Sequence, residues 1–525
     1  MATINRIIPP VIADDGSRHY SSVGSKPDDS TAMCHMVPDR VIPVIFVPGV
    51  MGSNLQTSTN NPVWLVNSST RMASDWALAN PTTRKQKLDP KNTTVCPDGN
   101  IPTGTAQTEA ELHRRGWGEV ANLSYGESLV WLENALNDID ACTDCGRKGL
   151  RAMLTQKLVA KVPGVDFLTR EEVALSYKYQ FPVHAVGYNW LQSNADSAQI
   201  LAKKIDEFTA YYRNKFRYRC DKVILVTHSM GGLVARHYTE VLDGGHRDRV
   251  LGVVHGVMPA TGAATAYKRV KTGTEGWAGL AIGPNAAAMT PVFAQSPGPL
   301  QLLPSPEYGM NWLKIKDGDR MVTLPKTDPY SEIYTQRGQW WGLCDDKLIN
   351  PLDKEKKAID QDWLDFAEII NTKVKEFHTQ IAGRYHQLTY AFYGDDTNHK
   401  AWGDVVWERD RSSAALWLGG SASIDDVTTG QVIRDTGMGE PMLQQRGGGT
   451  SMTTKFTVKA AGENGDGTVP IRSGRAPSQR AKVCVPYPGV DHEGAYKHQP
   501  QRLFTLWAIT KIAQNVKGTT LEYTA

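Results

Sequence analysis

Cysteine is scarce in this sequence: seven cysteines occur among 525 residues, an odd number at low density. Disulfides organise small secreted domains that are dense in cysteine, so they do not organise this fold. Cys142 and Cys145 form a lone C-x-x-C pair, and neither a second pair nor two histidines at the spacing of a zinc site follow it. We expect a local disulfide or two free thiols there.

Long apolar runs and an excess of one charge are also missing. No run of eighteen apolar residues occurs, so no spanning helix is expected and any membrane contact would be peripheral. Lys and Arg number 58 against 55 Asp and Glu, a net charge of +3, which argues against a nucleic-acid partner. The opening MATINRIIPP lacks a basic region followed by an apolar stretch, so no cleavable signal peptide is expected.

Six continuous apolar runs are present instead. Runs without polar alternation are typical of strands buried on both faces, as in parallel sheets. Helical patterns lie between some of them, for example at 197–216. This order predicts an α/β fold with a mainly parallel central sheet. The runs are VIPVIFVPG (41–49), HAVGYNW (184–190), KVILVTH (222–228), VLGVVHG (250–256), QLTYAFYG (387–394) and AKVCVPYPG (481–489).

One run leads directly into Thr-His-Ser-Met-Gly at 227–231, followed by a helical pattern. A sharp strand-to-helix turn of this kind, usually written G-x-S-x-G, projects its serine above the carboxyl edge of a sheet. Gly231 leaves room for the helix beside the strand, whereas Thr227, with its branched Cβ, replaces the first glycine and fits less well. Ser229 is therefore the candidate nucleophile, and a serine that only caps the helix is the plain alternative.

An acid and a histidine should follow the serine in that order. Asp466 lies between two glycines in NGDGTVP (464–470), where a tight turn would project its carboxylate. Asp395 or Asp396, directly after an apolar run, is the alternative acid.

The candidate base lies after the last apolar run, in PGVDHEGAY (488–496). His492 can reach the serine from such a loop, and His498 is the second choice. His228 is next to the serine in sequence but is expected to point away from it. A zinc-protease H-E-x-x-H motif would need a histidine where Tyr496 stands, which argues against metal-dependent proteolysis.

An oxyanion hole would complete the site. In PGVMG (48–52), two glycines let the backbone approach a substrate, and the helix after the serine starts with a free N–H. The N–H groups of Val50 and Met230 are the candidates. This chemistry needs no cofactor; structural calcium in the acidic loops stays open, with no ligands assigned.

Several of these motifs resemble a known family. PVIFVPGVMGSNL (43–55) resembles the opening strand of lecithin:cholesterol acyltransferase-like lipases and lysosomal phospholipase A2, and THSMGG (227–232) is similar to the elbow of PGAP1-like esterases. GYNW (187–190) resembles their Tyr-Asp-Trp segment, with asparagine in place of aspartate.

The acid turn and the histidine loop are similar to the same family. The resemblance implies that Ser229 is the nucleophile, Asp466 the acid and His492 the base, with Val50 and Met230 at the oxyanion hole. It also places Asp466 ahead of Asp395.

Two further segments, HGVMPATGAATAYKR (255–269) and SPGPLQLLPSPEYG (296–309), resemble lipase effectors of the type VI secretion system. This resemblance implies cleavage of phospholipids of rival bacteria and a cognate immunity protein as partner. It also implies a bacterial cytoplasmic protein that the secretion system delivers into the periplasm of the target cell.

Together these features predict an α/β-hydrolase. We expect an irregular N-terminal arm at 1–39 and one hydrolase domain at 40–525, with cap or lid insertions at about 60–180 and 262–385. The tryptophan-containing stretches 276–283 and 339–343 are expected in a lid or in the core of the cap. The predicted activity is hydrolysis of a lipid ester, as a phospholipase A or a lipase, through an acyl-enzyme. An acyltransferase with the same triad and an inactive hydrolase fold that only binds are the alternatives.

Overall fold

A computed structural model provides the structure of the protein. It describes residues 5–8, 11–12, 18–24, 30–34, 38–67, 76, 78–138, 149–274, 283–411 and 423–523. Cys142, Cys145 and nearly all of the expected lid stretch 276–283 lie outside the described residues.

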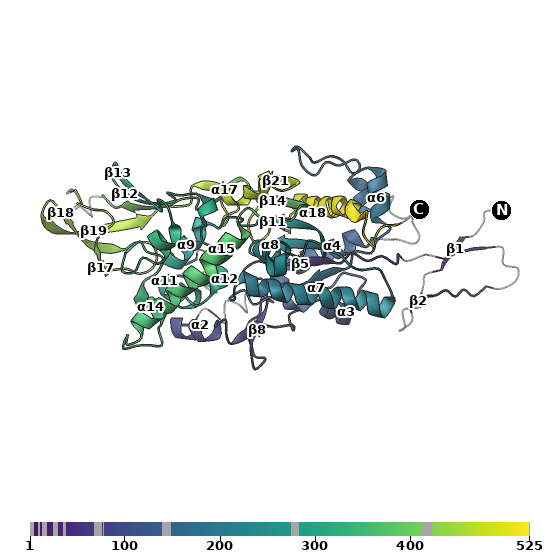
Figure 1. Ribbon diagram of the computed structural model, residues 1–525, viewed down its shortest axis with the longest axis horizontal. Coiled ribbons are helices and arrows are strands. Elements are labelled where there is room, and N and C mark those ends of the chain that lie inside the picture. Colours follow the sequence, from purple (N-terminus) through teal and green to yellow (C-terminus); the bar gives the residue numbers. More distant parts are fainter. Residues whose placement is uncertain are drawn as a thin grey trace.

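The centre of the molecule is a six-stranded parallel sheet (Figure 1). Each of the six apolar runs forms one of its strands, so the predicted fold class is confirmed. The inner strands are buried along their whole length, which explains why their sequences carry no polar alternation. In spatial order the strands are β21 (Val483–Tyr487), β14 (Thr389–Gly394), β11 (Val250–Gly256), β10 (Val223–His228), β5 (Val44–Val47) and β9 (Val183–Ala185).

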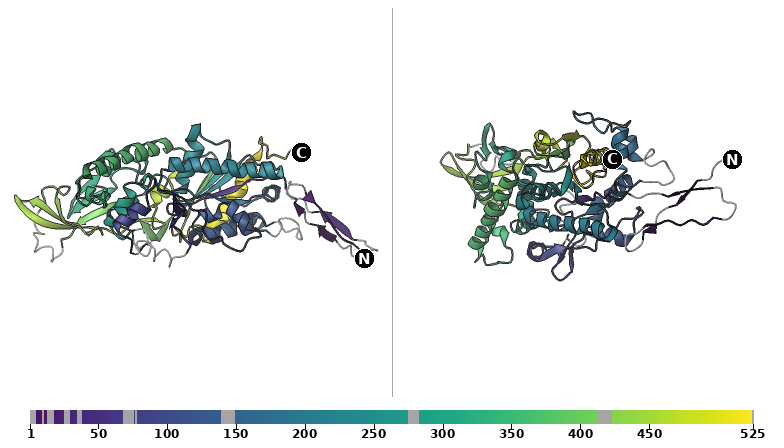
Figure 2. Two further views of the ribbon diagram at one scale, coloured as in Figure 1. Left: turned by 90° about the horizontal axis from the view of Figure 1, so that it is seen from below. Right: turned by 45° about the vertical axis from the view of Figure 1, so that its right-hand side comes forward.

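Helices cover both faces of this sheet (Figures 1 and 2). On β11, Gly252 packs against Ile512 of α18 (Gln499–Ile512). His255 of the same strand faces α8 (Gly231–Glu240) on the other side, beside α7 (Asn194–Phe216). Successive residues of a strand point to opposite faces, so Gly252 and His255, three residues apart, face opposite sides, and α8 and α18 lie on opposite sides of the sheet.

The order of the strands places two loops together. β9 follows β5 in the chain and pairs with one of its edges, whereas β10 pairs with the other edge. The connections therefore leave in opposite directions at β5 and β10, a topological switch point. In open α/β sheets a ligand binds at this position, outside the carboxyl ends of the strands, which here are the loops after Val47 and His228.

The insertion at 262–385 forms a helical cap with its own apolar core, at the left of the sheet in Figure 1. Trp340 and Trp341 are 3% and 6% exposed, so they belong to the core of the cap and not to a lid. The main cap helices are α9 (Ala264–Thr272), α11 (Ala286–Phe293), α12 (Pro297–Leu300), α14 (Ile359–Glu368) and α15 (Glu376–Ile381).

A second six-stranded sheet extends the cap and forms the far end of the molecule (Figure 1). Most of its strands come from the segment between β14 and β21, which contains an additional insertion that the expected boundaries leave out. Its order is β13 (Arg320–Leu324), β12 (Leu313–Asp317), β16 (Val405–Arg409), β19 (Thr450–Val458), β18 (Met442–Gly447) and β17 (Gln431–Arg434).

The first insertion, at about 60–180, packs against β9 through α4 (Asn122–Leu136), and against α18 through α4, α5 (Leu150–Met153) and α6 (Arg170–Ser176). It also contains α2 (Pro81–Lys87) and α3 (Glu109–Arg114). Its strands β7 (Pro62–Trp64) and β8 (Thr93–Val95) pair with β6 (Leu55–Thr57), just before the insertion, in a three-stranded sheet.

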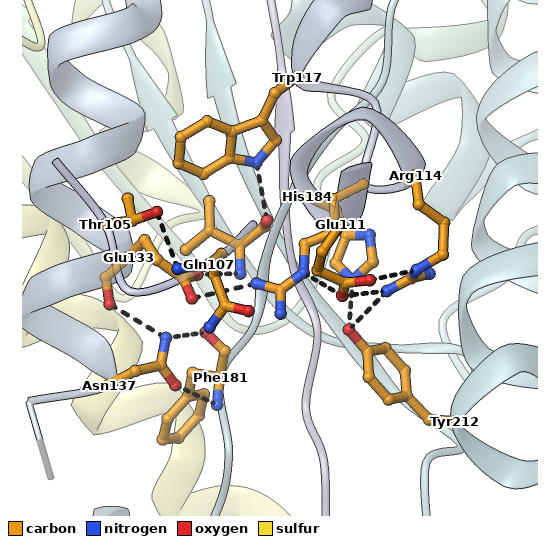
Figure 3. Close-up of polar contacts among 12 residues, drawn as sticks. Thr105, Gln107, Glu111, Arg114, Trp117, Glu133, Asn137, Phe181, His184 and Tyr212 are labelled. Atoms are coloured by element: carbon orange, nitrogen blue, oxygen red, sulfur yellow. Dashed lines mark hydrogen bonds and ion pairs between the residues drawn. The ribbon is translucent and has the colours of Figure 1, made fainter. Parts of the chain in front are cut away.

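A buried ion cluster fastens this insertion to the edge strand (Figure 3). Arg115 donates to Glu111 at 2.8 Å and to Glu133 of α4 at 3.0 Å. The other oxygen of Glu133 accepts the N–H of Val183, the first residue of β9, at 2.8 Å. The guanidinium of Arg114 donates to Glu111 at 2.7 Å, and its Nη2 lies 3.5 Å from the hydroxyl of Tyr212 on α7. The cluster thus ties α3, α4, α7 and β9 together.

The composition of the N-terminal arm predicts an irregular segment, but the arm contains paired strands. Strand β1 (Asn5–Ile8) pairs in parallel with β4 (Thr31–Cys34), and β2 (Val11–Ile12) pairs with β3 (Arg18–His19). This segment projects from the end of the molecule opposite the cap (Figure 1). Among the residues that the structure describes, no helix is long and apolar enough to cross a bilayer.

Candidate active site

Ser229 lies at a sharp turn between β10 and α8. Its φ of +52° is in the left-handed region, which a non-glycine residue adopts at a cost. Its N–H donates to the carbonyl oxygen of Gly256 at 3.0 Å, and its own carbonyl accepts from Gly232 at 2.9 Å. A Cβ at Gly231 would lie 2.4 Å from the carbonyl oxygens of Val47 and Pro48, so only glycine lets the helix start this close to β5.

Thr227 fits the position where the motif has its first glycine. The residue is fully buried, and its hydroxyl lies 2.8 Å from Nδ1 of His255 on the neighbouring strand. Burial lowers the pKa of His255 to about 3, so this imidazole is neutral and one of its nitrogens is a hydrogen-bond acceptor. The threonine therefore has a specific partner in the sheet, which the sequence motif alone does not reveal.

The structure brings Ser229, His492 and Asp466 together from three separate segments. Nε2 of His492 lies 2.8 Å from the Ser229 hydroxyl, and Nδ1 lies 2.8 Å from Oδ2 of Asp466. Because an ionised carboxylate only accepts, Nδ1 carries the hydrogen and Nε2 accepts the serine proton. This is the arrangement that a base needs in order to deprotonate a serine.

Asp466 is held firmly in its turn. It is 2% exposed, and its Oδ1 accepts the N–H groups of Thr468 at 2.9 Å and Val469 at 2.7 Å. Gly394, at the end of β14, leaves room for it, since a Cβ there would lie 2.7 Å from that of Asp466. Oδ2 thus remains directed at the imidazole.

The alternative acids and the second-choice base have other partners. Asp395 accepts from Asn464 at 3.0 Å. Asp396 lies 2.7 Å from His399 Nδ1 and accepts the N–H of Gly489 at 3.0 Å. His498 lies 3.0 Å from a carboxylate oxygen of Asp491. None of these contacts includes Ser229.

The two oxyanion-hole candidates lie on either side of the serine. Val50 lines the same cavity as Ser229 and His492, and Met230 follows the serine directly at the start of α8. In the part of the chain that the structure describes, neither N–H is used in a backbone hydrogen bond. Both groups are thus free to donate to a developing negative charge, and their role stays a prediction.

A cavity of about 120 Å³ opens beside the serine and histidine. It lies under cap helices α9, α11 and α12, and apolar side chains form most of its wall. A preformed cavity of roughly this size accommodates a small hydrocarbon. Arg269 and Thr468 also line it and are hydrogen bonded to each other at 3.1 Å. The main apolar lining residues are Val270, Met289, Phe293, Leu300, Leu302 and Leu303.

Two residues near the site make contacts that the sequence did not indicate. Among the described hydrogen bonds none joins the His228 ring to Ser229; instead its Nε2 lies 2.7 Å from the carbonyl oxygen of His492. Its Nδ1 lies 2.9 Å from the hydroxyl of Tyr125, which comes from α4 in the first insertion. Tyr125 lies 103 residues before His228 in the chain, so no local sequence signal pointed to this contact.

Within the described ranges, no group of three or more His, Cys, Asp or Glu side chains is placed to hold a metal ion. Whether structural calcium binds stays open, with no ligands assigned.

The fold and this site define an α/β-hydrolase with a large cap. The chain is similar to a chain in the crystal structure of the Tle4–Tli4 complex: the two are 30% identical, the match covers 90% of this chain and 98% of that one, and the TM-score is 0.74. At this identity and coverage, the chain belongs to the Tle4 family. No family model matches the sequence, and no curated protein matches it. The resemblance to lecithin:cholesterol acyltransferase-like and PGAP1-like enzymes stays a prediction.

Proposed function

We propose that this protein is a type VI secretion lipase effector that hydrolyses an acyl ester of phospholipids, with Ser229, His492 and Asp466 as its catalytic triad. The observation that carries the proposal is the continuous hydrogen-bonded chain from the Ser229 hydroxyl through His492 to Asp466. Membership of the Tle4 family and the effector-like segments at 255–269 and 296–309 support it independently.

In the first half of the reaction, His492 Nε2 takes the proton of Ser229 as Oγ attacks the acyl carbonyl carbon. The carbonyl oxygen becomes negative, and the N–H groups of Val50 and Met230 donate to it. The intermediate then collapses. The ester bond breaks, His492 gives its proton to the leaving alcohol oxygen, and the acyl group remains on Ser229.

In the second half, His492 takes a proton from water, which attacks the acyl-enzyme and releases the fatty acid. The proton returns to Ser229 Oγ. Asp466 keeps Nδ1 of His492 protonated throughout and stabilises the imidazolium that forms twice in each cycle.

The apolar wall of the cavity supports the proposal that the substrate is a lipid. An acyl chain transferred from water to an apolar wall gains about 0.8 kcal/mol for each buried methylene group. Since Ser229 and residues of α11 and α12 line the same cavity, an acyl chain bound there can place its ester carbonyl at the hydroxyl.

The Tle4 structure also holds Tli4. By analogy, we propose that a cognate immunity protein binds this chain and blocks its activity inside the producing cell. This partner is a proposal from family membership, and no surface of this chain is assigned to it.

Phospholipid turnover tests the activity. Wild-type protein should release a fatty acid and a lysophospholipid from mixed micelles, with both products identified by mass. Ser229→Ala should lower the rate by at least about 10³-fold. Ser197→Ala is the matched control, because Ser197 is also buried but its hydroxyl donates to the carbonyl oxygen of Ser193, the N-cap of α7, at 3.2 Å. Equal turnover by Ser229→Ala and the wild type would refute the proposal, and transfer of the acyl group to an added alcohol in place of water would indicate an acyltransferase.

A further inference from the structure

Tyr125 and His228 form a bridge between the two loops that flank Ser229. The N–H of Gly49, on the loop after β5, lies 3.2 Å from the Tyr125 hydroxyl. That hydroxyl lies 2.9 Å from His228 Nδ1, and His228 Nε2 lies 2.7 Å from the carbonyl oxygen of His492. Three hydrogen bonds thus run from the residue before Val50 to the backbone of the proposed base.

The direction of each hydrogen bond is fixed by its partners. The carbonyl of His492 can only accept, so Nε2 of His228 carries a hydrogen and donates it. Nδ1 of a neutral imidazole must then accept, and the Tyr125 hydroxyl donates to it. The same hydroxyl oxygen accepts the N–H of Gly49. Every donor and acceptor along the bridge is satisfied, with no choice of tautomer left.

The bridge is neutral as well as complete. Burial, with a smaller effect of His492, lowers the pKa of His228 to about 3, and burial raises the pKa of Tyr125. Both side chains are therefore uncharged at neutral pH. A second positive charge next to His492 would oppose formation of its imidazolium, and the neutral His228 avoids this.

The bridge is also tightly packed. Tyr125 and His228 are 3% and 5% exposed, and the Tyr125 ring lies 4.9 Å from that of Phe46 on β5. A Cβ at Gly52 would lie 2.6 Å from the Tyr125 hydroxyl, and one at Gly49 would lie 2.9 Å from His228 Nδ1. The loop therefore lies directly on the two side chains, and neither can move without moving it.

We propose that Tyr125 and His228 are positioning residues, which hold the loop carrying Val50 and the loop carrying His492 at a fixed separation across Ser229. The inference rests on the proposed function, since it assigns the oxyanion hole and the base to those loops. It gives the first insertion a part in catalysis, because α4 supplies the tyrosine that connects them. A shift of about 1 Å between such groups can lower a rate about 100-fold without touching the reacting atoms.

Tyr125→Phe tests the bridge with the smallest change, because it removes one hydroxyl and keeps the ring. We expect kcat on a phospholipid to fall about 10- to 100-fold, with KM within about twofold of the wild type. Tyr179→Phe is the matched control: Tyr179 is 1% exposed and its hydroxyl donates to a backbone carbonyl, that of Leu521, at 2.9 Å. It should match Tyr125→Phe in melting temperature and the wild type in kcat.

His228 provides a second, independent test. Glutamine can place an N–H where Nε2 lies, whereas leucine cannot, so kcat of His228→Gln should exceed that of His228→Leu by about tenfold at similar melting temperatures. If both variants and Tyr125→Phe keep the wild-type kcat, the inference is wrong; if Tyr125→Phe does not fold, the His228 pair decides. Ser229→Ala distinguishes failure of this inference from failure of the proposed function. If Ser229→Ala alone loses turnover, the proposed triad stands and the bridge has no part in catalysis; if Ser229→Ala keeps its turnover, the proposed function itself is wrong.

Discussion

Asp466 and His492 are joined twice. The Asp466 carboxylate lies 2.8 Å from His492 Nδ1, and the main-chain N–H of His492 donates to the main-chain carbonyl of Asp466 at 2.9 Å. The second bond does not depend on the side chain of Asp466. The loop that carries His492 is thus anchored to the acid turn even when the carboxylate is changed, which allows the charge to be tested separately from the geometry.

Asp466→Asn should fold and lose most of its activity. The amide fills the same space, but it can present an N–H to Nδ1 and so favour the wrong tautomer of His492. We expect kcat to fall by about 10³- to 10⁴-fold, measured on a soluble ester at neutral pH. Asp395→Asn is the control, because Asp395 bonds to Asn464 and not to a histidine. Comparable losses in the two variants would contradict the assignment of Asp466.

The cavity should set the preferred length of the acyl chain. Ala266 lines it from α9, and Ala266→Phe would place a ring in the space that we assign to the chain. The ratio of kcat/KM for a long-chain ester to that for an acetyl ester should fall at least about tenfold. Ala202→Phe, at a partly buried alanine of α7 that does not line the cavity, should leave the ratio unchanged. An unchanged ratio in Ala266→Phe would place the acyl chain elsewhere.

The ion cluster at the edge of the central sheet should contribute strongly to stability. The side chains of Arg115 and Glu133 are 7% and 4% exposed. Arg115→Met would leave the carboxylate of Glu133 buried without its counter-ion, at a cost of about 3–5 kcal/mol. Lys203→Met, in an exposed ion pair with Glu207, should cost less than about 1 kcal/mol. Urea titration gives the free energy of unfolding of both variants. Equal losses in Arg115→Met and Lys203→Met would mean that the buried ion cluster does not stabilise the attachment of the first insertion to the sheet.

Stability should fall as the pH is lowered from 7 to 5. Burial lowers the pKa of His228 and His255 to about 3 and that of His378 to about 4. In the unfolded chain these groups titrate near 6.5, so below that pH the unfolded state binds protons that the native state does not. Above about pH 6.5 the histidines leave the free energy of unfolding unchanged. As the pH falls from there toward 4, each histidine lowers the free energy of unfolding by up to about 1.4 kcal/mol per pH unit.

The urea midpoint measures this effect. It should be lower at pH 5 than at pH 7.5. A midpoint that stays constant or rises at pH 5 would show that these histidines are protonated in the native state.

The central sheet could be predicted because burial on both faces leaves a continuous apolar sequence. KVILVTH forms β10, and the five other runs form the remaining strands of the same sheet. One face of the cap's sheet is exposed to solvent. Strands β18 and β12 therefore alternate between buried and partly or fully exposed residues and carry many polar side chains. For this reason the polar, glycine-containing sequence of 425–455 predicts no more than a loop or a weak hairpin. Gly448 and Gly449, both with positive φ, form the turn of its β18–β19 hairpin.

For the site, the sequence indicated the segments and not their connections. Ser229, Asp466 and His492 stand out because each follows a strand or a turn with recognisable residues. Tyr125 and His228 do not stand out, since their contact joins an inserted helix to the central sheet and is visible only after folding. Similarly, Thr227 is an imperfect match to the elbow motif until its partner His255 is known.

Covalent labelling by a fluorophosphonate tests the central claim most directly. The reagent forms a bond from its phosphorus to an activated serine oxygen and releases fluoride, so it reports on nucleophilicity without depending on a lipid substrate. We predict one adduct per chain, located at Ser229 by peptide mass, and at least about 10³-fold slower labelling in His492→Ala. Labelling of another serine, or an undiminished rate in His492→Ala, would contradict the account.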